Sequence, residues 1–288
     1  MYTACRAKSI CVLPQSWRPW DHGAVEAIIE LERAAAEHWR GTEQEWLGNW
    51  LLRAAEGFTG RANSALPLGD PGLPLDDALA AVIGWYRARG LPPMVAVPLP
   101  LEGPAVADVV PSCPLPSRFD DQLSERSWAT RPGPAYVMTA ELATLPPAPG
   151  LPAGAEFRVD AEPDDAWLAM YHYRGQQRAP PVLRTVLMSA PAQGFASIRA
   201  GGGRDVLAIG RLSVGAGWAG ITAVEVDPAL RRAGLGTALT LGICAEAASR
   251  AAQRVFLQVE TANVAARALY ERIGFGYSHR YHYRVAPR

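Results

Sequence analysis

The sequence contains few of the residues that build metal sites and disulfide frameworks. Its 288 residues include 4 cysteines and 5 histidines. The cysteines show no CxxC or Cys/His ligand spacing and the histidines are dispersed, so we expect no metal site. Cys244 lies in an apolar stretch typical of a helix, where a free cysteine acts as a small buried hydrophobe.

An excess of charge of one sign and long apolar runs are missing as well. Lys+Arg and Asp+Glu both number 28. This balance gives no global attraction to nucleic acid or to an acidic membrane, so we expect neither as a partner. No run of about 18 apolar residues predicts a membrane span, and the first residues, MYTACR, lack the apolar core of a signal peptide. We expect a cytoplasmic protein that acts as a monomer or a homodimer.

Proline is concentrated at one point near the middle of the chain. Residues 145–152 read Leu-Pro-Pro-Ala-Pro-Gly-Leu-Pro. Prolines at this density exclude a helix or a central strand. We predict an extended linker over residues 146–154, which separates a first domain, residues 1–145, from a second, residues 155–288.

The second half alternates between strand and helix patterns, which predicts an α/β fold with a mixed sheet that has a parallel section. The expected strands are Glu156–Asp160, Val206–Leu212, Gly220–Val226, Val255–Glu260 and Tyr277–Val285, and the expected helices are Asp164–Tyr173, Gly234–Ala252 and Val264–Ile273. The first half shows a fainter version of this order, with a helix at Asp76–Arg89 and a strand at Met94–Pro98. Its Leu123-Ser-Glu-Arg segment echoes Leu269-Tyr-Glu-Arg, which indicates an internal duplication.

The segment Val224–Thr237 contains the strongest functional signal. A strand ends at Asp227-Pro228, a loop with Arg231, Arg232, Gly234 and Gly236 follows, and a helix begins within it. Unpaired N–H groups and the positive end of the helix dipole make such a loop a site for a pyrophosphate. The glycines allow close approach and the arginines add charge-assisted bonds. Taken alone, the loop is explained equally well by glycines that serve packing only.

The segment Asn263–Phe275 follows the next expected strand. Asn263 is a good helix N-cap, and Tyr270 lies close to two turns further on, so the two side chains share a helix face about 10 Å apart. Ala266 lies between them and leaves a smooth groove. The alternative interpretation makes Asn263 a cap only and Tyr270 an ordinary core residue.

Together the two segments resemble the GNAT family of acyltransferases. The loop fits the family pattern Gln/Arg-x-x-Gly-x-Gly/Ala, and the later segment fits Asn-x-x-Ala-x-x-Leu-Tyr-x-x-x-Gly-Phe. This resemblance covers about residues 155–288, and the whole chain is similar in layout to a tandem GNAT such as the mycothiol synthases, with a mixed sheet flanked by helices in each half. The first half departs from the pattern. Asp70-Pro71 stands where the phosphate loop is expected and Ser124 where the tyrosine is expected, so we interpret residues 1–145 as a degenerate copy.

The resemblance implies acetyl-CoA as co-substrate and a set of residues that bind it: Val224, Glu225, Val226, Arg231, Arg232, Ala233, Gly234, Leu235, Gly236, Thr237, Asn263, Ala266 and Tyr270. Backbone N–H groups of Val224–Val226 would polarise the thioester carbonyl, and Tyr270 would act as the general acid that protonates the CoA sulfur.

The general base is not evident from the sequence. In some family members a glutamate acts as the general base at one of two positions, which here carry Gly220 and Gln258. This leaves Glu225, Glu260 or a chain of water molecules as candidates. His172 and His282 lie in aromatic runs that are either core or lining of the acceptor pocket.

We therefore expect an acetyl-CoA-dependent N-acetyltransferase that acts by direct attack in a ternary complex. The acceptor would be a primary amine of a small molecule, an antibiotic or a peptide, with the amino-sugar thiol precursor of mycothiol synthesis as one version. The alternatives are a non-catalytic acyl-CoA sensor or scaffold and another acyl-CoA reaction such as decarboxylation.

Overall fold

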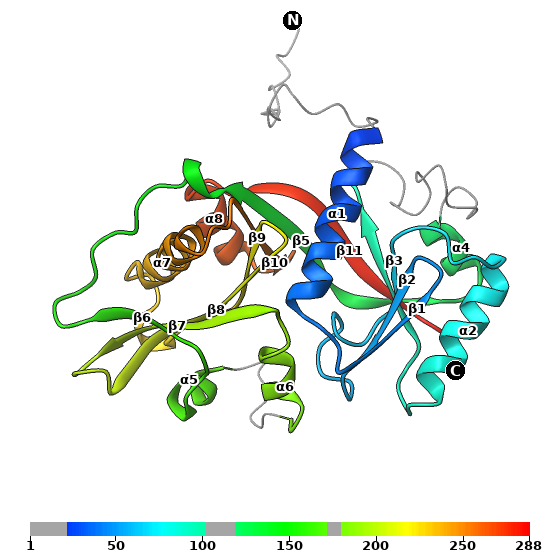
Figure 1. The fold of residues 1–288 in the computed structure, drawn as a ribbon, viewed down its shortest axis with the longest axis horizontal. Helices are drawn as coiled ribbons and strands as arrows, with labels where there is room; N and C mark the ends of the chain where they lie inside the picture. The colour runs from blue at the N-terminus through cyan, green and yellow to red at the C-terminus, as the bar shows by residue number, and fades with distance from the viewer. Residues whose placement is uncertain (1–21, 102–118, 172–179) are drawn as a thin grey trace, which may run out of the picture.

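The computed structural model describes residues 22–101, 119–171 and 180–288, and it has a mixed α/β fold built on one large sheet (Figure 1). That sheet has the strand order β4-β11-β5-β10-β9-β8-β7-β6, and a small second sheet has the order β1-β2-β3. The first half comprises α1 (His22–His38), β1 (Glu43–Leu47), β2 (Trp50–Ala54), β3 (Leu66–Pro67), α2 (Leu75–Arg87), β4 (Met94–Leu99), α4 (Phe119–Glu125) and β5 (Ala129–Glu141).

The second half begins after a short 3-10 turn, η1 (Leu142–Thr144), and the irregular, proline-rich segment. It comprises β6 (Glu156–Asp160), α5 (Asp165–Met170), α6 (Leu183–Leu187), β7 (Ala192–Ala200), β8 (Asp205–Gly215), β9 (Trp218–Val226), η3 (Pro228–Leu230), α7 (Leu235–Ser249), β10 (Arg254–Glu260), α8 (Val264–Arg272) and β11 (Gly276–Val285). The elements expected here are present, apart from small shifts at their ends. The strands β5 and β7, the helix α1 and the β1–β2 hairpin were not expected.

The two halves exchange their last strands toward the β4 end of the large sheet. β5, from the first half, pairs with β10, and β11, from the second half, pairs with β4; β5 and β11 also pair with each other, all antiparallel. In Figure 1 the β5 and β11 ribbons lie side by side where the two halves meet. The halves therefore share one sheet instead of each closing its own, because the final strand of each half completes the sheet of the other.

The core of the second half lies between α7 and the sheet. α7 is apolar on all sides and has nine buried residues, which is the pattern of a helix enclosed by other elements. It contacts β7, β8 and β9. Helix α1, from the first half, also contacts β8 and β9. The sheet of the second half is thus covered in part by the first half.

A buried arginine, Arg211, joins the ends of α1 and α6. Nε of Arg211, on β8, donates to the carbonyl oxygen of Leu187 at 2.6 Å, and its Nη1 donates to that of His38 at 3.1 Å. The two carbonyls end α6 and α1, one helix from each half. A cation at a helix C-terminus interacts favourably with the helix dipole, so Arg211 joins the two halves beneath the sheet surface.

Candidate active site

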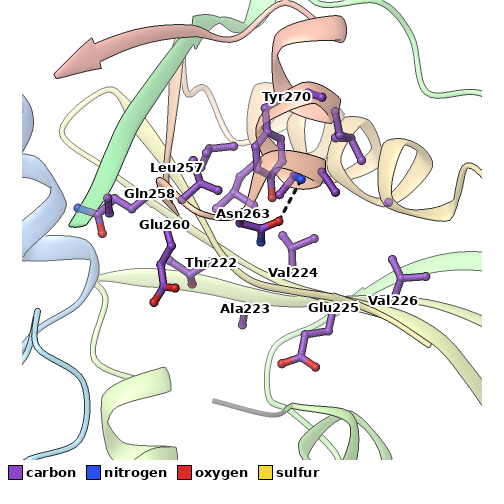
Figure 2. Close-up of a pocket in the computed structure, with 18 of the residues that line it drawn as sticks. Thr222, Ala223, Val224, Glu225, Val226, Leu257, Gln258, Glu260, Asn263 and Tyr270 are labelled. Atoms are coloured by element: carbon purple, nitrogen blue, oxygen red, sulfur yellow. Dashed lines mark hydrogen bonds between the residues drawn. The ribbon is translucent and has the colours of Figure 1, made fainter. Parts of the chain in front are cut away.

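A cavity of about 1060 Å³ opens where β9 and β10 separate. The two strands pair in parallel from Arg254↔Trp218 to Leu257↔Ile221, and their pairing ends there. Beyond this point Thr222–Val226 and Gln258–Glu260 line the two sides of the cavity (Figure 2). The separation leaves the edge of β9 without a β10 partner, so its backbone groups face the cavity.

A β-bulge reshapes β9 at the start of this edge. The register between β8 and β9 shifts between Ile209 and Arg211, and Ala223 adopts a left-handed backbone with φ 56°. Such a conformation costs about 1–3 kcal/mol in a residue with a side chain and is found where the surroundings enforce it, often at functional sites. The bulge redirects the strand at the point where the cavity begins.

The loop between β9 and α7 forms one end of the cavity. Asp227 caps η3 by accepting a hydrogen bond from Ala229 N at 2.8 Å, and Arg232 and Gly234 follow with φ 70° and 81°. The first intrahelical bond of α7 runs from Ala238 N to Gly234 O, and no side chain caps the helix. The N–H groups of Leu235, Gly236 and Thr237 therefore precede the helical ladder and form a nest for an anion.

The two glycines of this loop serve different purposes. A Cβ on Gly234 would meet nothing within 4 Å, so glycine is favoured there by its left-handed backbone alone. A Cβ on Gly236 would lie 3.1 Å from Leu269 Cδ1, so Gly236 also allows α7 and α8 to approach closely. Both line the cavity, as do Leu235 and Thr237.

The charges at this end suit a phosphate. Arg231 and Arg232 are exposed at the cavity, and neither forms an ion pair within the described part of the chain. Arg272, which the sequence analysis did not single out, adds a third cation, with Nη2 3.3 Å from Thr237 Oγ1. Ala233 is not among the lining residues. The uncapped N–H groups and these arginines fit the pyrophosphate of acetyl-CoA, and the apolar edges of β9 and α8 fit its extended arm.

Helix α8 places Asn263 and Tyr270 on the same wall. Asn263 Oδ1 accepts from Ala266 N at 3.1 Å, so Asn263 caps the helix, and all three residues line the cavity. Tyr270 is 7% exposed, and burial raises its pKa to about 12. Its hydroxyl points toward Val224 on β9, across the separation of the strands (Figure 2). The hydroxyl is therefore protonated at neutral pH and lies beside the exposed strand edge.

The carboxylates considered as bases come from the two separated strands, Glu225 from β9 and Glu260 from β10. Both residues line the cavity, and both carboxylates extend away from the Tyr270 ring (Figure 2). The two alternative positions carry no acid. Gly220 is enclosed, because a Cβ there would lie 2.8 Å from the Phe256 ring and 2.9 Å from His38 Nδ1. Gln258 Oε1 accepts from Arg61 Nη1 at 2.7 Å.

Several lining residues were not among the site residues predicted from the sequence. They are Thr59, Gly60 and Arg61 from the first half, Gly133 and Ala135 of β5, Tyr171 after α5, and Tyr281 and Tyr283 of β11. The aromatic run of β11 was a visible pattern, but alternation alone does not tell which face meets a cavity. The cavity is therefore lined jointly by residues of the two halves.

His282, one of the two histidines flanked by aromatic residues, does not line the cavity. His282 Nε2 lies 2.8 Å from Asp120 Oδ1 and is not among the lining residues, so of the two interpretations the structure favours a packing role over a place in the acceptor pocket. Arg284 also binds Asp120, with Nε and Nη2 at 2.8 and 2.9 Å. This cluster joins β11 to α4. His172 lies outside the described residues.

The loop of the first half that was compared with the phosphate loop has one of its donors occupied internally. Asp70 Oδ1 accepts from Gly72 N at 2.7 Å, which uses an N–H group that a phosphate would need. The C-terminal caps of α4 and α8 match, with Trp128 N donating to Leu123 O and Phe275 N to Tyr270 O. Leu123, not Ser124, therefore occupies the position of Tyr270, and the assignment of Ser124 was one residue out of register.

The described residues contain neither a cluster of metal-ligating side chains nor a membrane-spanning helix. Among residues 22–101, 119–171 and 180–288, no group of three or more His, Cys, Asp or Glu side chains could hold a metal ion. Within the same ranges, no helix has the length and apolar character needed to cross a membrane.

Comparison with known proteins identifies the family. A family model described as "Probable histone acetyltransferase Rv0428c C-terminal" matches residues 26–284. The chain is 30% identical over 263 residues to the "Probable histone acetyltransferase Rv0428c" of Mycobacterium tuberculosis, covering 91% of this chain and 74% of that protein. It is 26% identical over 274 residues to the uncharacterized N-acetyltransferase YobR of Bacillus subtilis, covering 91% and 99%. Over 171 residues it is 35% identical to a mycothiol acetyltransferase of Thermobispora bispora, covering 51% and 55%.

Solved structures show the same fold. A GCN5-related N-acetyltransferase from Kribbella flavida aligns with a TM-score of 0.61 at 17% identity, over 92% of this chain and 96% of that one. A tandem GNAT protein from the clavulanic acid biosynthesis pathway aligns with a TM-score of 0.59 at 13% identity, over 82% and 77%. The chain therefore belongs to the Rv0428c C-terminal family of GNAT acetyltransferases, and it is an acyltransferase whose co-substrate is acetyl-CoA.

Proposed function

We propose that this enzyme acetylates a primary amine of a small molecule, an antibiotic or a peptide by direct attack on the thioester. The observation that supports this most is the continuity of one cavity from the phosphate loop, past the separated strands and Tyr270, to residues of the first half. Such a cavity would admit the co-substrate at one end and an acceptor at the other. The thioester and the amine would then meet between Val224 on β9 and Tyr270 on α8.

Binding and polarisation would fall to the loop and the strand edge. Arg231, Arg232 and the N–H groups of Leu235, Gly236 and Thr237 would hold the pyrophosphate. Acetyl-CoA supplies an acetyl group already activated as a thioester. Backbone N–H groups of Val224–Val226 would stabilise the negative charge that develops on the carbonyl oxygen, as an oxyanion hole does.

Proton transfer would involve one tyrosine and one carboxylate. The Tyr270 hydroxyl, which is protonated at neutral pH, would donate a proton to the departing thiolate. Glu225 or Glu260 would take the proton of the attacking amine through water, since both line the cavity and their carboxylates extend away from the Tyr270 ring. The Tyr270 hydroxyl favours an enzyme over a sensor that only binds acyl-CoA, because binding alone needs no proton donor at this position.

The names of the relatives suggest two acceptor types. The name "Probable histone acetyltransferase" of the M. tuberculosis relative suggests a lysine side chain of a peptide, and that of the mycothiol acetyltransferase suggests an amino-sugar derivative. Release of free thiol from acetyl-CoA, measured against peptides, aminoglycosides and amino sugars, would decide between them. If no amine accelerates thiol release, the proposed reaction is wrong and the sensor remains.

Replacing Tyr270 by Phe tests the proposed acid. The variant keeps the ring packed against Phe275 and removes only the hydroxyl. Positioned proton transfer contributes about 10²–10⁴-fold, so we expect kcat to fall by that factor while acetyl-CoA affinity stays nearly unchanged. A normal kcat with the best amine would show that another donor protonates the thiolate.

A further inference from the structure

The loop between β2 and β3 carries part of the first half into the cavity of the second. Its residues Thr59, Gly60 and Arg61 line the same cavity as Tyr270, although they lie about 200 positions earlier in the chain. The loop therefore reaches the acceptor end, away from the phosphate-binding loop that precedes α7.

Internal hydrogen bonds fix the shape of this loop. The side chain of buried Asn63 accepts from Ala55 N and Gly57 N at 2.8 and 2.9 Å. It donates to the carbonyl oxygens of Phe58 and Thr59 at 2.6 and 2.8 Å. These bonds hold Thr59 in a left-handed conformation with φ 61°. A strained backbone that its surroundings enforce so thoroughly is typical of a loop that positions a functional group.

Arg61 is the group that this loop positions. Its guanidinium lies over the Trp39 ring, 4.8 Å from the centroid, and Nη1 donates to Gln258 Oε1 at 2.7 Å. Trp39 is in turn fixed by its Nε1, which donates to Thr59 Oγ1 at 2.9 Å. The half-buried cation is thus held at the cavity wall by contacts from both halves.

A second cation reinforces the positive charge behind this wall. Arg211 also faces the Trp39 ring, 5.2 Å from the centroid, and it is fully buried. Its Nη2 has no hydrogen-bond partner among the described residues, and its Nη1 is 3.5 Å from Oγ1 of the lining residue Thr222. The field of a buried cation is weakly screened, so it adds to that of Arg61 at this end of the cavity.

We propose that Arg61 binds an anionic group of the acceptor, so that the substrate is an amine that also carries a carboxylate or a phosphate. This inference rests on the proposed acetyl transfer. The planar guanidinium presents parallel N–H donors that match either anion. Glu225 and Glu260 line the same cavity and suit the ammonium group of such a molecule. The first half would thereby select the acceptor for chemistry carried out by the second.

Matched acceptor pairs test the proposal. Glucosamine 6-phosphate against glucosamine isolates a phosphate, and a lysine peptide with a free against an amidated carboxyl terminus isolates a carboxylate. For the pair of the correct class, we expect the anionic member to have a kcat/KM about 10- to 100-fold higher, since a charged hydrogen bond is lost in the neutral one. Arg61→Gln should remove this preference without changing the KM for acetyl-CoA.

Arg254→Gln is the matched control. Arg254 also lies over a tryptophan, 4.1 Å from the Trp218 centroid, and also links the halves through Glu30, but it does not line the cavity. This variant should keep the preference. Equal use of both members in each pair, or a preference that survives Arg61→Gln, would overturn the proposal.

Calorimetry of the CoA complex gives a readout independent of turnover. With CoA bound, the wild type should bind the anionic member more tightly than Arg61→Gln does by a similar factor. If no amine is acetylated but this difference in binding is found, the proposed reaction fails and the role of Arg61 stands. If an amine is acetylated but wild type and Arg61→Gln bind the anionic member equally well, the proposed reaction stands and the role of Arg61 fails.

Discussion

His38 packs against Gly220, the residue of β9 that has no side chain. Its Nδ1 is 2.9 Å from Ser213 Oγ and its Nε2 donates to Gly215 O at 3.2 Å. A Cβ on Gly220 would lie 2.9 Å from the same Nδ1, so the ring and the glycine depend on each other. A histidine of the first half thus packs where a catalytic glutamate was considered, and it does so as a core residue outside the cavity.

This packing predicts a loss of stability in mild acid. Burial lowers the pKa of His38 to about 4, with the Gly215 carbonyl opposing that shift and the Arg211 charge adding to it. Between pH 6.5 and 4 the unfolded chain binds a proton that the folded chain excludes, so the free energy of unfolding falls as pH falls. The loss attributable to His38 is about 3 kcal/mol.

Urea unfolding at pH 7 and pH 4 measures this effect. His38→Gln should be less stable at pH 7 but should lose about 3 kcal/mol less than the wild type on acidification. Burial raises the pKa of Asp120, but His282 and Arg284 lower it further, and its contribution is the same in wild type and variant and so cancels in the comparison. Parallel losses in wild type and variant would contradict the assignment.

At the scale of elements, the N-terminus of α7 is the feature that depends most on a single backbone conformation. Gly234 precedes the helix with φ 81°, and a side chain there would meet open space. Gly234→Asp should therefore fold, at a cost of about 1 kcal/mol for the left-handed backbone. It should weaken acetyl-CoA binding, because a carboxylate would stand beside the pyrophosphate.

Gly234→Asn separates charge from shape, since asparagine has the same size and tolerates the left-handed region. Calorimetric titration should give a Kd for acetyl-CoA at least about tenfold weaker for Asp than for Asn, because like charges about 4 Å apart repel by roughly 1–4 kcal/mol. Equal affinities in the two variants would place the pyrophosphate elsewhere.

This element was predictable because its signals are local. The end of β9, the glycines and the start of α7 lie within 14 consecutive residues, and each has its own backbone rule. β5 was missed because Pro132, Gly133 and Pro134 interrupt the strand pattern of its sequence. The segment is a strand because it pairs along its length with β10 and β11. Pairing partners more than a hundred residues away override a weak local preference.

At the scale of the whole molecule, the same limit applied to the acceptor end. Arg61 and Gln258 meet only because the halves exchange strands, and no spacing in the sequence reports a contact across 197 positions. The division into residues 1–145 and 155–288 stays a prediction, and in the structure β5 and β11 cross it. The duplication also stays a prediction, which the paired order β4-β11-β5-β10 and the matching caps of α4 and α8 support.

The proposed degeneracy of the first half predicts one acetyl-CoA per chain. Asp70 already accepts the Gly72 N–H and would repel a phosphate, and Leu123 offers no hydroxyl at the position of Tyr270. Calorimetric titration should therefore give a stoichiometry near one. Gly234→Asp should weaken binding at that one site, and no second binding site should then be detected. Gly72→Asp is the matched control, since Gly72 also precedes a helix, has φ 73° and would place its side chain in open space. It should leave the titration unchanged. A stoichiometry near two, with one site lost in each variant, would show instead that both copies of the fold bind the co-substrate.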